Sequence, residues 1–374
     1  MVSTETDLGL LYTKPDVRLC SADDSRAWDD YVVSHPHGSV YHLFAWKRII
    51  ESAYGHKAYY LIARKYDKNA GKDKITGILP LFYLKNFIFG KSLVSLPYID
   101  YAGILSNDRA SSAELLSRAI ETAQELGVDN FEMRHPASIP MIEIDSLGSI
   151  NCRYSVNTHK VRMLLPLPES ASTLMESFKS KLRSQIGKPK KIGLHSSIGG
   201  IELLDDFYEV MLVNMRDLGS PIHSKNFFRN ILRELKDYAR LCIVYKNNTR
   251  LAGGLTFGFK EKLSNPWASS LRKHQSLCPN MLLYWSMLEF ACSSGCTVFD
   301  FGRSSPGEGS YKFKEQWGAV PEQLCWHSVG FNESLPRSSA ADKEKFGLAV
   351  TFWKRLPVFS TRFLGPMIRK HISL

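Results

Sequence analysis

The feature that most limits how this chain can fold is an internal repeat. Residues 126–134 (LGVDNFEMR) match residues 294–303 (SGCTVFDFGR) once one residue is added, so a helix end, a glycine, an apolar strand and an arginine recur. A β-hairpin pattern precedes each copy, over residues 58–84 and 240–259. Because the repeated unit exceeds about 100 residues, it indicates two duplicated domains rather than a solenoid, whose units have roughly 20–50 residues.

The order of elements in each half is helix, helix, hairpin, strand, helix, strand, which predicts an α/β (α+β) fold. A chain of 374 residues is longer than most single domains, in agreement with a duplication. We expect a first domain over residues 1–165, a second over 166–335 and a basic helical tail over 336–374. The equivalent lobes are expected at Arg18–Arg134 and Arg240–Ala319, each a mostly antiparallel sheet with helices on both sides.

Polar side chains gather most densely in residues 299–319 (FDFGRSSPGEGSYKFKEQWGA). Residues 296–301 predict a strand, residues 302–309 a turn rich in glycine, and Ser310 the cap of a short helix. Proteins of the α/β class place ligands just past the carboxyl ends of strands, so this segment is a candidate site. The same pattern also suits a strand and helix whose glycines only permit tight turns and whose lysines are solvated.

This segment resembles the FemAB-like (Fem) family of bacterial aminoacyl and acyl transferases, which are built from GNAT-like (acyl-CoA N-acyltransferase) domains. The similar features are Asp-Phe-Gly-Arg at 300–303, a turn with proline and glycine, and aromatic-x-Phe-Lys-x-x-aromatic-Gly at 311–318. Within the family the segment is most similar to the branch found with exopolysaccharide and PEP-CTERM/exosortase gene sets. The resemblance implies two tandem GNAT-like domains and N-acyl transfer to an amine of a cell-envelope or exopolysaccharide precursor.

Amide formation needs a group that neutralises the acceptor amine and a hydrogen-bond donor for the tetrahedral oxyanion. By match to the Phe-Lys of the family, Lys314 is the candidate oxyanion donor, and Asp300 or Asp100 is the candidate base. Arg303 and Tyr311 are expected to support them. The other substrate-binding candidates of this segment are Ser304 and Trp317.

A second group of candidates lies in residues 96–103 (LPYIDYAG), where a proline and a glycine can open a strand to a ligand. Its members are Tyr98, Asp100 and Tyr101, and the family resemblance assigns part of the acceptor site to the first domain. Trp267 and Arg272 follow the second hairpin at near-alternate strand positions and could face one cleft. Ordinary strand ends with a core tryptophan and solvated charges explain these residues equally well.

The acyl donor is not specified by the sequence. A coenzyme A site of the usual kind has a glycine-rich loop before its main helix, whose backbone N–H groups bind the pyrophosphate. The corresponding residues 272–280 (RKHQSLCPN) contain no glycine. Acyl-CoA and aminoacyl-tRNA therefore both stay open as donors, with no other cofactor expected. The missing loop also favours a rival class, a non-catalytic GNAT-fold protein that binds an anionic glycan or nucleotide.

The charge of the chain points to an anionic partner. The net charge is +11, and residues 179–191 carry six of the basic side chains without one acid. Such a surface suits the phosphates of a nucleotide, a glycan precursor or tRNA, and DNA is not among the expected partners. The tail combines basic residues with phenylalanines, which suits either peripheral contact with a membrane or packing on the second domain.

The seven cysteines are scattered through apolar runs, as expected for reduced thiols, and the cluster His35, His37 and His42 lacks the further ligands of a metal site. We therefore expect no metal. The first residues lack the apolar core of a secretory signal, and no run of about 20 apolar residues predicts a membrane span. A cytoplasmic location follows as the expectation, with a peripheral place at the inner face of the membrane as its variant.

Overall fold

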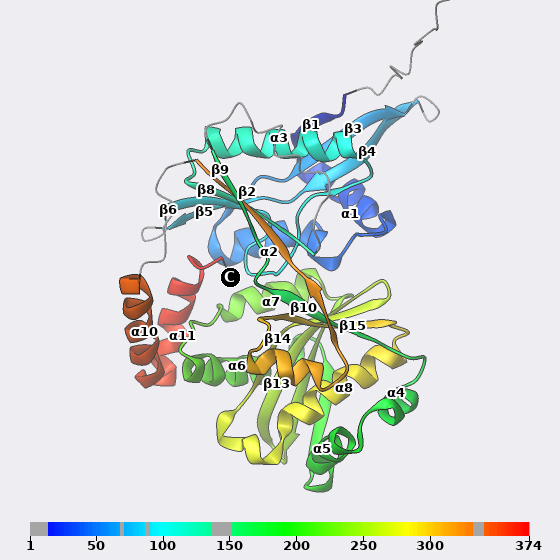
Figure 1. Cartoon of the computed structure of the whole chain (residues 1–374), viewed down its shortest axis with the longest axis vertical. Coiled ribbons are helices and arrows are strands. Elements are labelled where there is room, and N and C mark those ends of the chain that lie inside the picture. The colour runs from blue at the N-terminus through cyan, green and yellow to red at the C-terminus, as the bar shows by residue number, and fades with distance from the viewer. Residues whose placement is uncertain (1–13, 68–70, 87–89, 137–151, 332–339, 374) are drawn as a thin grey trace, which may run out of the picture.

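The computed structural model describes residues 14–67, 71–86, 90–136, 152–331 and 340–373. They form two stacked lobes, with a helical tail beside the second lobe and the C-terminus at the junction between the lobes (Figure 1).

The first lobe holds two sheets and three helices. One sheet has the strand order β1-β3-β4-β7 and the other β2-β5-β6-β8-β17-β9. Helix α3 packs against β3 and β4. The elements are β1 (Asp16–Leu19), α1 (Ser25–Ser34), α2 (Ala45–Tyr54), β2 (Lys57–Ala58), β3 (Leu61–Asp67), β4 (Lys72–Leu79), β5 (Phe82–Asn86), β6 (Gly90–Val94), β7 (Leu105–Ser106), α3 (Arg109–Glu125), β8 (Asn130–His135) and β9 (Arg153–Asn157).

The second lobe is built on one sheet with the order β11-β12-β13-β14-β15-β10-β16. Helices α6 and α8 contact its central strands. The elements are β10 (Val161–Pro166), α4 (Ala171–Ser177), α5 (Ser180–Lys191), β11 (Leu194–Gly199), α6 (Leu204–Leu218), α7 (Lys225–Glu234), β12 (Ala239–Lys246), β13 (Thr249–Phe259), β14 (Lys262–Ser270), the 3-10 helix η5 (Arg272–Leu277), α8 (Pro279–Ser293), β15 (Val298–Ser304), α9 (Gly309–Glu315) and β16 (Val320–Gln323). The next strand, β17 (Cys325–Gly330), pairs in the sheet of the first lobe.

The repeat seen in the sequence is a repeat of structure. In each lobe a strand leads through a helix to a strand that runs parallel to it, β6-α3-β8 and β14-α8-β15, in sheets that are otherwise antiparallel. Both helices end on the same glycine cap. The Gly127 N–H donates to the carbonyl three residues earlier and the next N–H to the carbonyl five residues before itself, and Gly295 repeats both bonds. Both glycines have a positive φ, 57° and 73°, which glycine adopts without strain.

Two strands join the sheet of the other half of the chain. β10 lies between β15 and β16 in the second lobe, and β17 lies between β8 and β9 in the first. The expected division at residues 165 and 166 therefore falls at the end of β10, inside the second sheet. We propose a division in which residues 152–157 and 325–330 belong to the first lobe and residues 161–323 to the second.

The lobes share a hydrophobic core. Helices α2 and α7 pack on each other across the junction. The ring of Tyr41 from the first lobe makes edge contacts with Tyr101 at 5.0 Å and with Phe257 of the second lobe at 5.9 Å between centroids. Because aromatic contacts of this kind resist separation, the junction is a fixed surface on which a site can be built.

One expected strand is interrupted. Residues 93–105 have a β pattern, but the structure shows strands only at β6 and β7, with residues 95–104 between them outside any strand. Pro97 has no N–H for a sheet, and Tyr98 has a φ of +73°, a conformation that a strand does not allow. This segment bulges instead toward the second lobe.

The tail consists of α10 (Ala340–Arg355) and α11 (Val358–Arg369), which pack on α6 as an antiparallel pair beside the second lobe (Figure 1). Gly365 is buried in that contact, because a Cβ there would lie 3.0 Å from Ile222. No helix among the described residues is both long and apolar enough to cross a membrane.

Candidate functional site

The site begins where two strands of the second lobe separate. β14 and β15 pair in parallel only over Lys262–Ser264 and Val298–Asp300, and then diverge. Gly302 lies just past this point with a φ of +73°, and a Cβ there would lie 3.1 Å from the carbonyl oxygen of Asn265. Glycine is therefore required at position 302 on two counts, conformation and space.

A small cavity lies at the split, between the lobes and the end of the tail. We call it the junction cavity; its volume is about 160 Å³. Three parts of the chain that are far apart in sequence line it: Tyr98, Ile99 and Asp100 of the first lobe, Pro266, Trp267 and Arg303 of the second, and Arg369 of α11. It holds one carboxylate and two guanidinium groups, so its charge suits a ligand with an anionic group and an amine.

Asp100 and Arg303 join the two lobes. The backbone N–H of Arg303 donates to Asp100 Oδ2 at 3.2 Å, and its guanidinium lies 3.4 Å from Oδ1. Both side chains are between a fifth and a third exposed, so a ligand in the cavity can reach them.

Trp326 contacts both members of this pair, and no motif in the sequence indicates its role. Its Nε1–H donates to the Asp100 carbonyl oxygen at 3.0 Å. Two guanidinium groups lie over its ring, that of Arg134 at 5.1 Å and that of Arg303 at 5.3 Å from the ring centroid. These are the two arginines that end the repeated strands. The two equivalent arginines of the repeat therefore lie over the same ring, that of Trp326. This cation–π arrangement holds both guanidinium groups in place.

Lys314 is next to the point where β14 and β15 separate. Its Nζ donates to the carbonyl oxygens of Gly302 at 3.0 Å and Arg303 at 2.8 Å, and its side chain is buried. Burial lowers the pKa of Lys314 to about 8, against the opposing influence of Asp100 and Asp300. An ammonium has three N–H donors, so the two bonds leave one for another acceptor.

Asp300 faces away from the junction cavity, toward β10. It accepts a hydrogen bond from the Gly302 N–H at 2.8 Å, and its Oδ2 lies 3.9 Å from the guanidinium of Arg162. Burial raises the pKa of Asp300, and Arg162 opposes that rise. Tyr101 belongs to the same buried group, since the Arg162 guanidinium lies 5.1 Å from its ring centroid. Of the two candidate bases, Asp100 alone lines the cavity.

Tyr98 connects the end of the tail to the junction cavity by hydrogen bonds. The Tyr98 hydroxyl donates to the Lys370 carbonyl oxygen at 2.9 Å, and its backbone N–H donates to the Ser373 carbonyl oxygen at 2.7 Å. Arg369 donates from Nε to His223 Nε2 at 3.0 Å, and its guanidinium lies 5.9 Å from the Tyr98 ring centroid. Burial lowers the pKa of Arg369 to about 10.

Besides Lys314, Asp300 and Tyr101, four sequence candidates lie outside the lining of the junction cavity. Trp317 is in the core of the second lobe, 5.6 Å from the Phe178 ring, and Ser304 is buried in β15 opposite Val161. Tyr311 is half-buried on α9 and packs against the same core. Arg272 is exposed in η5, beyond the far end of β14. Residue type and spacing in the sequence could not distinguish these four residues from Trp267 and Arg303. Which side chains reach the cavity depends on where β14 and β15 separate.

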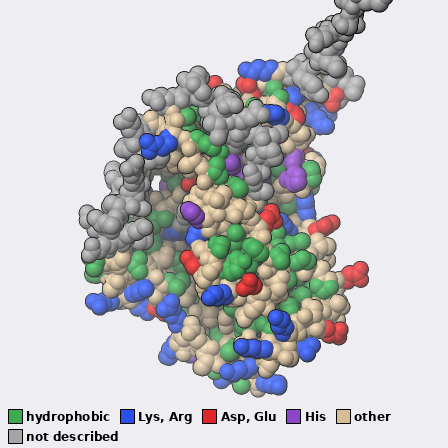
Figure 2. All heavy atoms as spheres, viewed as in Figure 1, with side chains coloured by type: hydrophobic (Ala, Val, Ile, Leu, Met, Phe, Trp, Pro, Cys, Tyr) green, Lys and Arg blue, Asp and Glu red, His purple; other side chains and the backbone are tan. Residues whose placement is uncertain are grey.

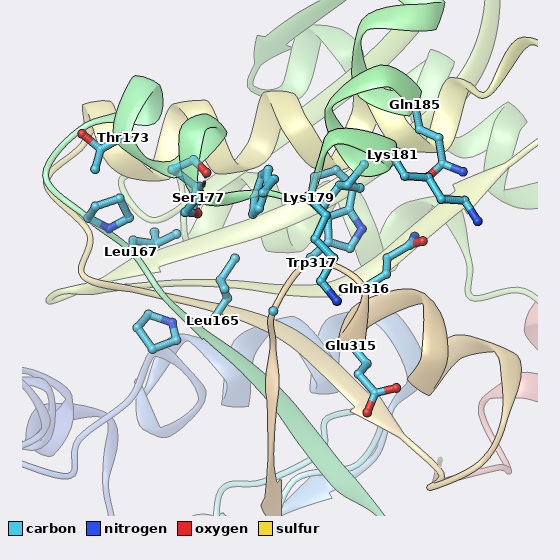
Figure 3. A pocket seen from close by; sticks show the side chains of 16 residues that line it. Leu165, Leu167, Thr173, Ser177, Lys179, Lys181, Gln185, Glu315, Gln316 and Trp317 are labelled. Carbon is cyan, nitrogen blue, oxygen red and sulfur yellow. Dashed lines mark hydrogen bonds between the residues drawn. The ribbon is translucent and has the colours of Figure 1, made fainter.

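The basic segment borders a larger groove of about 840 Å³ on the second lobe (Figure 3). Leu165, Leu174, Leu182 and Trp317 give it an apolar floor, and Lys179 and Lys181 stand at its rim. We call it the α5 groove. Figure 3 shows both lysines near Trp317 at one end of the groove.

Among the described residues, no three His, Cys, Asp or Glu side chains gather as metal ligands. His35 and His42 are both buried, and burial lowers the pKa of each.

Comparison with known proteins agrees with this geometry. Residues 177–315 match a family model described as an acetyltransferase (GNAT) domain. No curated protein sequence matches the chain. Among solved structures, FemX superposes with a TM-score of 0.64 at 15% identity, over 90% of this chain and 100% of FemX.

Two further structures share the fold. A tandem GNAT protein from the clavulanic acid biosynthesis pathway has a TM-score of 0.53 at 10% identity, over 86% of this chain and 99% of its own. The C-terminal domain of a protein described as a lysylphosphatidylglycerol synthetase, from Agrobacterium fabrum, has a TM-score of 0.52 at 12% identity, over 88% and 96%. Residues 177–315 are therefore similar to a GNAT acetyltransferase domain, and the chain as a whole shares the fold of FemX and of the tandem GNAT protein.

Proposed function

We propose that this protein is an N-acyltransferase that moves an aminoacyl or acyl group onto an amine of an anionic cell-envelope or exopolysaccharide precursor. The observation that carries the proposal is the junction cavity, where Asp100, Arg303 and Arg369 meet in front of the buried Lys314. The PEP-CTERM-associated branch of the FemAB-like proteins, to which the sequence is similar, is our choice for its biological setting.

The charges of the cavity fit an acceptor with two recognition groups. Arg303 and Arg369 present guanidinium groups that pair with a phosphate or carboxylate, and Asp100 presents a carboxylate that holds an amine. A volume of about 160 Å³ admits the reacting end of a precursor and excludes a whole nucleotide sugar. The rest of such a precursor would extend outside the cavity.

The proposed reaction follows from these positions. The acceptor nitrogen forms a bond to the acyl carbonyl carbon, whose oxygen becomes a tetrahedral oxyanion. Lys314 donates its third N–H to that oxyanion, and Asp100 accepts the proton that the nitrogen loses. Collapse of the intermediate breaks the bond to the donor, which leaves as a thiol of coenzyme A or as a ribose hydroxyl of tRNA after taking up a proton.

For the donor we propose the α5 groove as a binding surface. Lys179 and Lys181 stand at its rim, and α5 continues with Arg183, Lys188, Lys190 and Lys191, so the helix can follow a phosphate backbone. The glycine-free segment before α8 folds as η5, whose 3-10 turns occupy backbone N–H groups that a pyrophosphate loop would leave free. An aminoacyl-tRNA is therefore our first choice of donor, and an acyl-CoA the second.

The acceptor proposal also draws on one structural neighbour. A lysylphosphatidylglycerol synthetase is named for a product in which an aminoacyl group is attached to an anionic lipid. This chain would carry out the related transfer to an amine, on a precursor made at the inner face of the membrane.

Calorimetric titration of three ligands tests the recognition step. Glucosamine 1-phosphate has both the amine and the phosphate, glucosamine lacks the phosphate, and glucose 1-phosphate lacks the amine. We expect the first to bind at least about 10-fold more tightly than either of the others, since each lost charged contact removes about 1.5 kcal/mol or more.

Arg303→Gln should abolish the preference for phosphate, whereas Arg272→Gln, at an exposed arginine outside the cavity, should preserve it. Equal affinity for all three ligands, or an equal effect of the two substitutions, would refute this acceptor site. Tight binding without any acyl transfer from either donor would favour a non-catalytic binding protein instead.

A further inference from the structure

The most exposed large apolar side chains of the described chain lie together on the tail. Five of them have 64–68% of their surface exposed, and every other exposed large hydrophobic residue is at or below 55%. We call this group the tail stripe; its members are Leu348, Phe352, Phe359, Phe363 and Met367. Soluble proteins rarely leave several aromatic side chains so exposed in one place, so the stripe marks an interaction surface.

Helical spacing places the members of the stripe in one row on each of the two tail helices. Phe359, Phe363 and Met367 follow one another at intervals of four on α11, as Leu348 and Phe352 do on α10. The opposite face of α11 carries Thr361 and Gly365, which are buried against the second lobe. The buried face of α11 therefore already packs on the second lobe, and the stripe on its other face projects away from the protein.

The charges around the stripe identify its partner. Residues 345–374 contain six Lys or Arg and no Asp or Glu. Lys354 and Arg355 are exposed at the end of α10, and Lys and Arg side chains line the lower left edge of the molecule where the tail lies (Figure 2). A second copy of the tail would oppose positive charge with positive charge. A surface of anionic lipid satisfies both the apolar stripe and its basic border.

We propose that α10 and α11 lie in the interface of an anionic membrane, with the tail stripe among the first acyl carbons and Lys354 and Arg355 against the headgroups. The end of α11 supplies Arg369 to the junction cavity and holds Tyr98 through the backbone of Lys370 and Ser373. Docking therefore brings the cavity to the level of the headgroups. This deepens the proposed function, because the acceptor would then be carried by the membrane, but docking itself does not depend on any chemistry.

Vesicle sedimentation of the full chain tests the docking without any substrate. We expect binding to vesicles of phosphatidylglycerol and phosphatidylcholine, weak binding to phosphatidylcholine alone, and loss of binding as salt is raised. The double substitution Phe359→Ser and Phe363→Ser should lower the partition coefficient by about 10-fold or more, because two buried aromatic side chains are removed from the acyl region. Tyr66→Ser, at an exposed aromatic residue of β3 in the first lobe, is the matched control and should leave binding unchanged.

A second pair of variants tests the role of the basic residues beside the tail stripe. Lys354→Gln with Arg355→Gln should weaken binding to the anionic vesicles, whereas Lys188→Gln with Lys191→Gln on α5 should not. If both double variants lost vesicle binding equally, the protein would be attracted by its net charge alone, and that result would overturn the proposal. So would a wild-type protein that dimerises in solution while the Phe359→Ser and Phe363→Ser variant is monomeric, since a second copy would then cover the stripe. If vesicles bind as expected but no acyl transfer is found, the proposed function fails and the docking stands.

Discussion

Replacing Lys314 by methionine should remove the oxyanion donor while preserving the fold. Two opposing effects on stability nearly cancel. Loss of the bonds to the Gly302 and Arg303 carbonyls costs about 1–3 kcal/mol for each acceptor left without its donor. Against this, a pKa of about 8 in place of 10.5 means that folding disfavours the charged lysine by about 3 kcal/mol, which methionine recovers. For the two acceptors together the loss is about 2–6 kcal/mol, so we expect the free energy of unfolding to change by no more than about 3 kcal/mol.

The effect on catalysis should be much larger than the effect on stability. An interaction made mainly in the transition state appears in kcat, so Lys314→Met should lower kcat by roughly 100-fold or more with little change in acceptor affinity. The assay follows transfer of a radiolabelled aminoacyl group from tRNA, or release of coenzyme A thiol from an acyl-CoA. Lys312→Met is the control, because Lys312 is exposed and its side chain points about 200° away from that of Lys314 around the helix.

The pH dependence of kcat tests the role of Lys314 independently. The ammonium of Lys314 is lost as the pH rises through about 8, so kcat should fall above that pH. Lys314→Arg should move the decline to higher pH, since arginine stays charged. Stability should change in the other direction: between about pH 8 and 10.4 the unfolded chain binds more protons at this position, so the free energy of unfolding rises with pH. Equal, modest losses of activity in Lys312→Met and Lys314→Met that high salt reproduces would refute the catalytic role.

Three further predictions concern the strand split, the donor and the fold. Gly302→Ala should lower the melting temperature and the activity together, because a Cβ would lie 3.1 Å from the Asn265 carbonyl at a positive φ; unchanged values would show that the split is not rigid. Calorimetry with acetyl-CoA should show binding weaker than about 1 μM, or about −8 kcal/mol, and tighter binding would restore an ordinary acetyltransferase. Asp24→Asn should destabilise the first lobe, because hydrogen bonds from Arg18 and Ser21 hold the pKa of this buried carboxyl well below its usual range; the difference from wild type should shrink as the pH falls below about 4, and a constant difference in denaturant titrations would contradict it.

The sequence predicted the fold well because the repeat has a simple physical basis. The repeat is a helix that ends on a glycine with positive φ, followed by an apolar strand that carries an arginine near its end, and its two copies are marked by Gly127 and Gly295. What the pattern could not show is how the two lobes exchange β10 and β17, since strand pairing over such distances depends on the whole sheet.

The candidate site was predicted only in part for the same reason. Asp100, Trp267 and Arg303 lie in three separate segments of the sequence, and the structure places all three in the lining of the junction cavity. Trp317 follows a similar pattern and is buried in the core, because its position on the turn after α9 faces the sheet. Trp326 was missed, since no local spacing relates it to the two arginines that it joins.

The most direct test of the account is the chemical form of the product. The full-length protein would be incubated with an aminoacyl-tRNA or acyl-CoA and an acceptor that has both a phosphate and an amine, and the acceptor would be analysed by mass spectrometry. We predict one acyl group in place of one hydrogen on the acceptor, in a linkage that resists alkaline hydroxylamine, as an amide does, and a product that Lys314→Met forms far more slowly. A product that hydroxylamine cleaves would be an ester, which would contradict transfer to the amine.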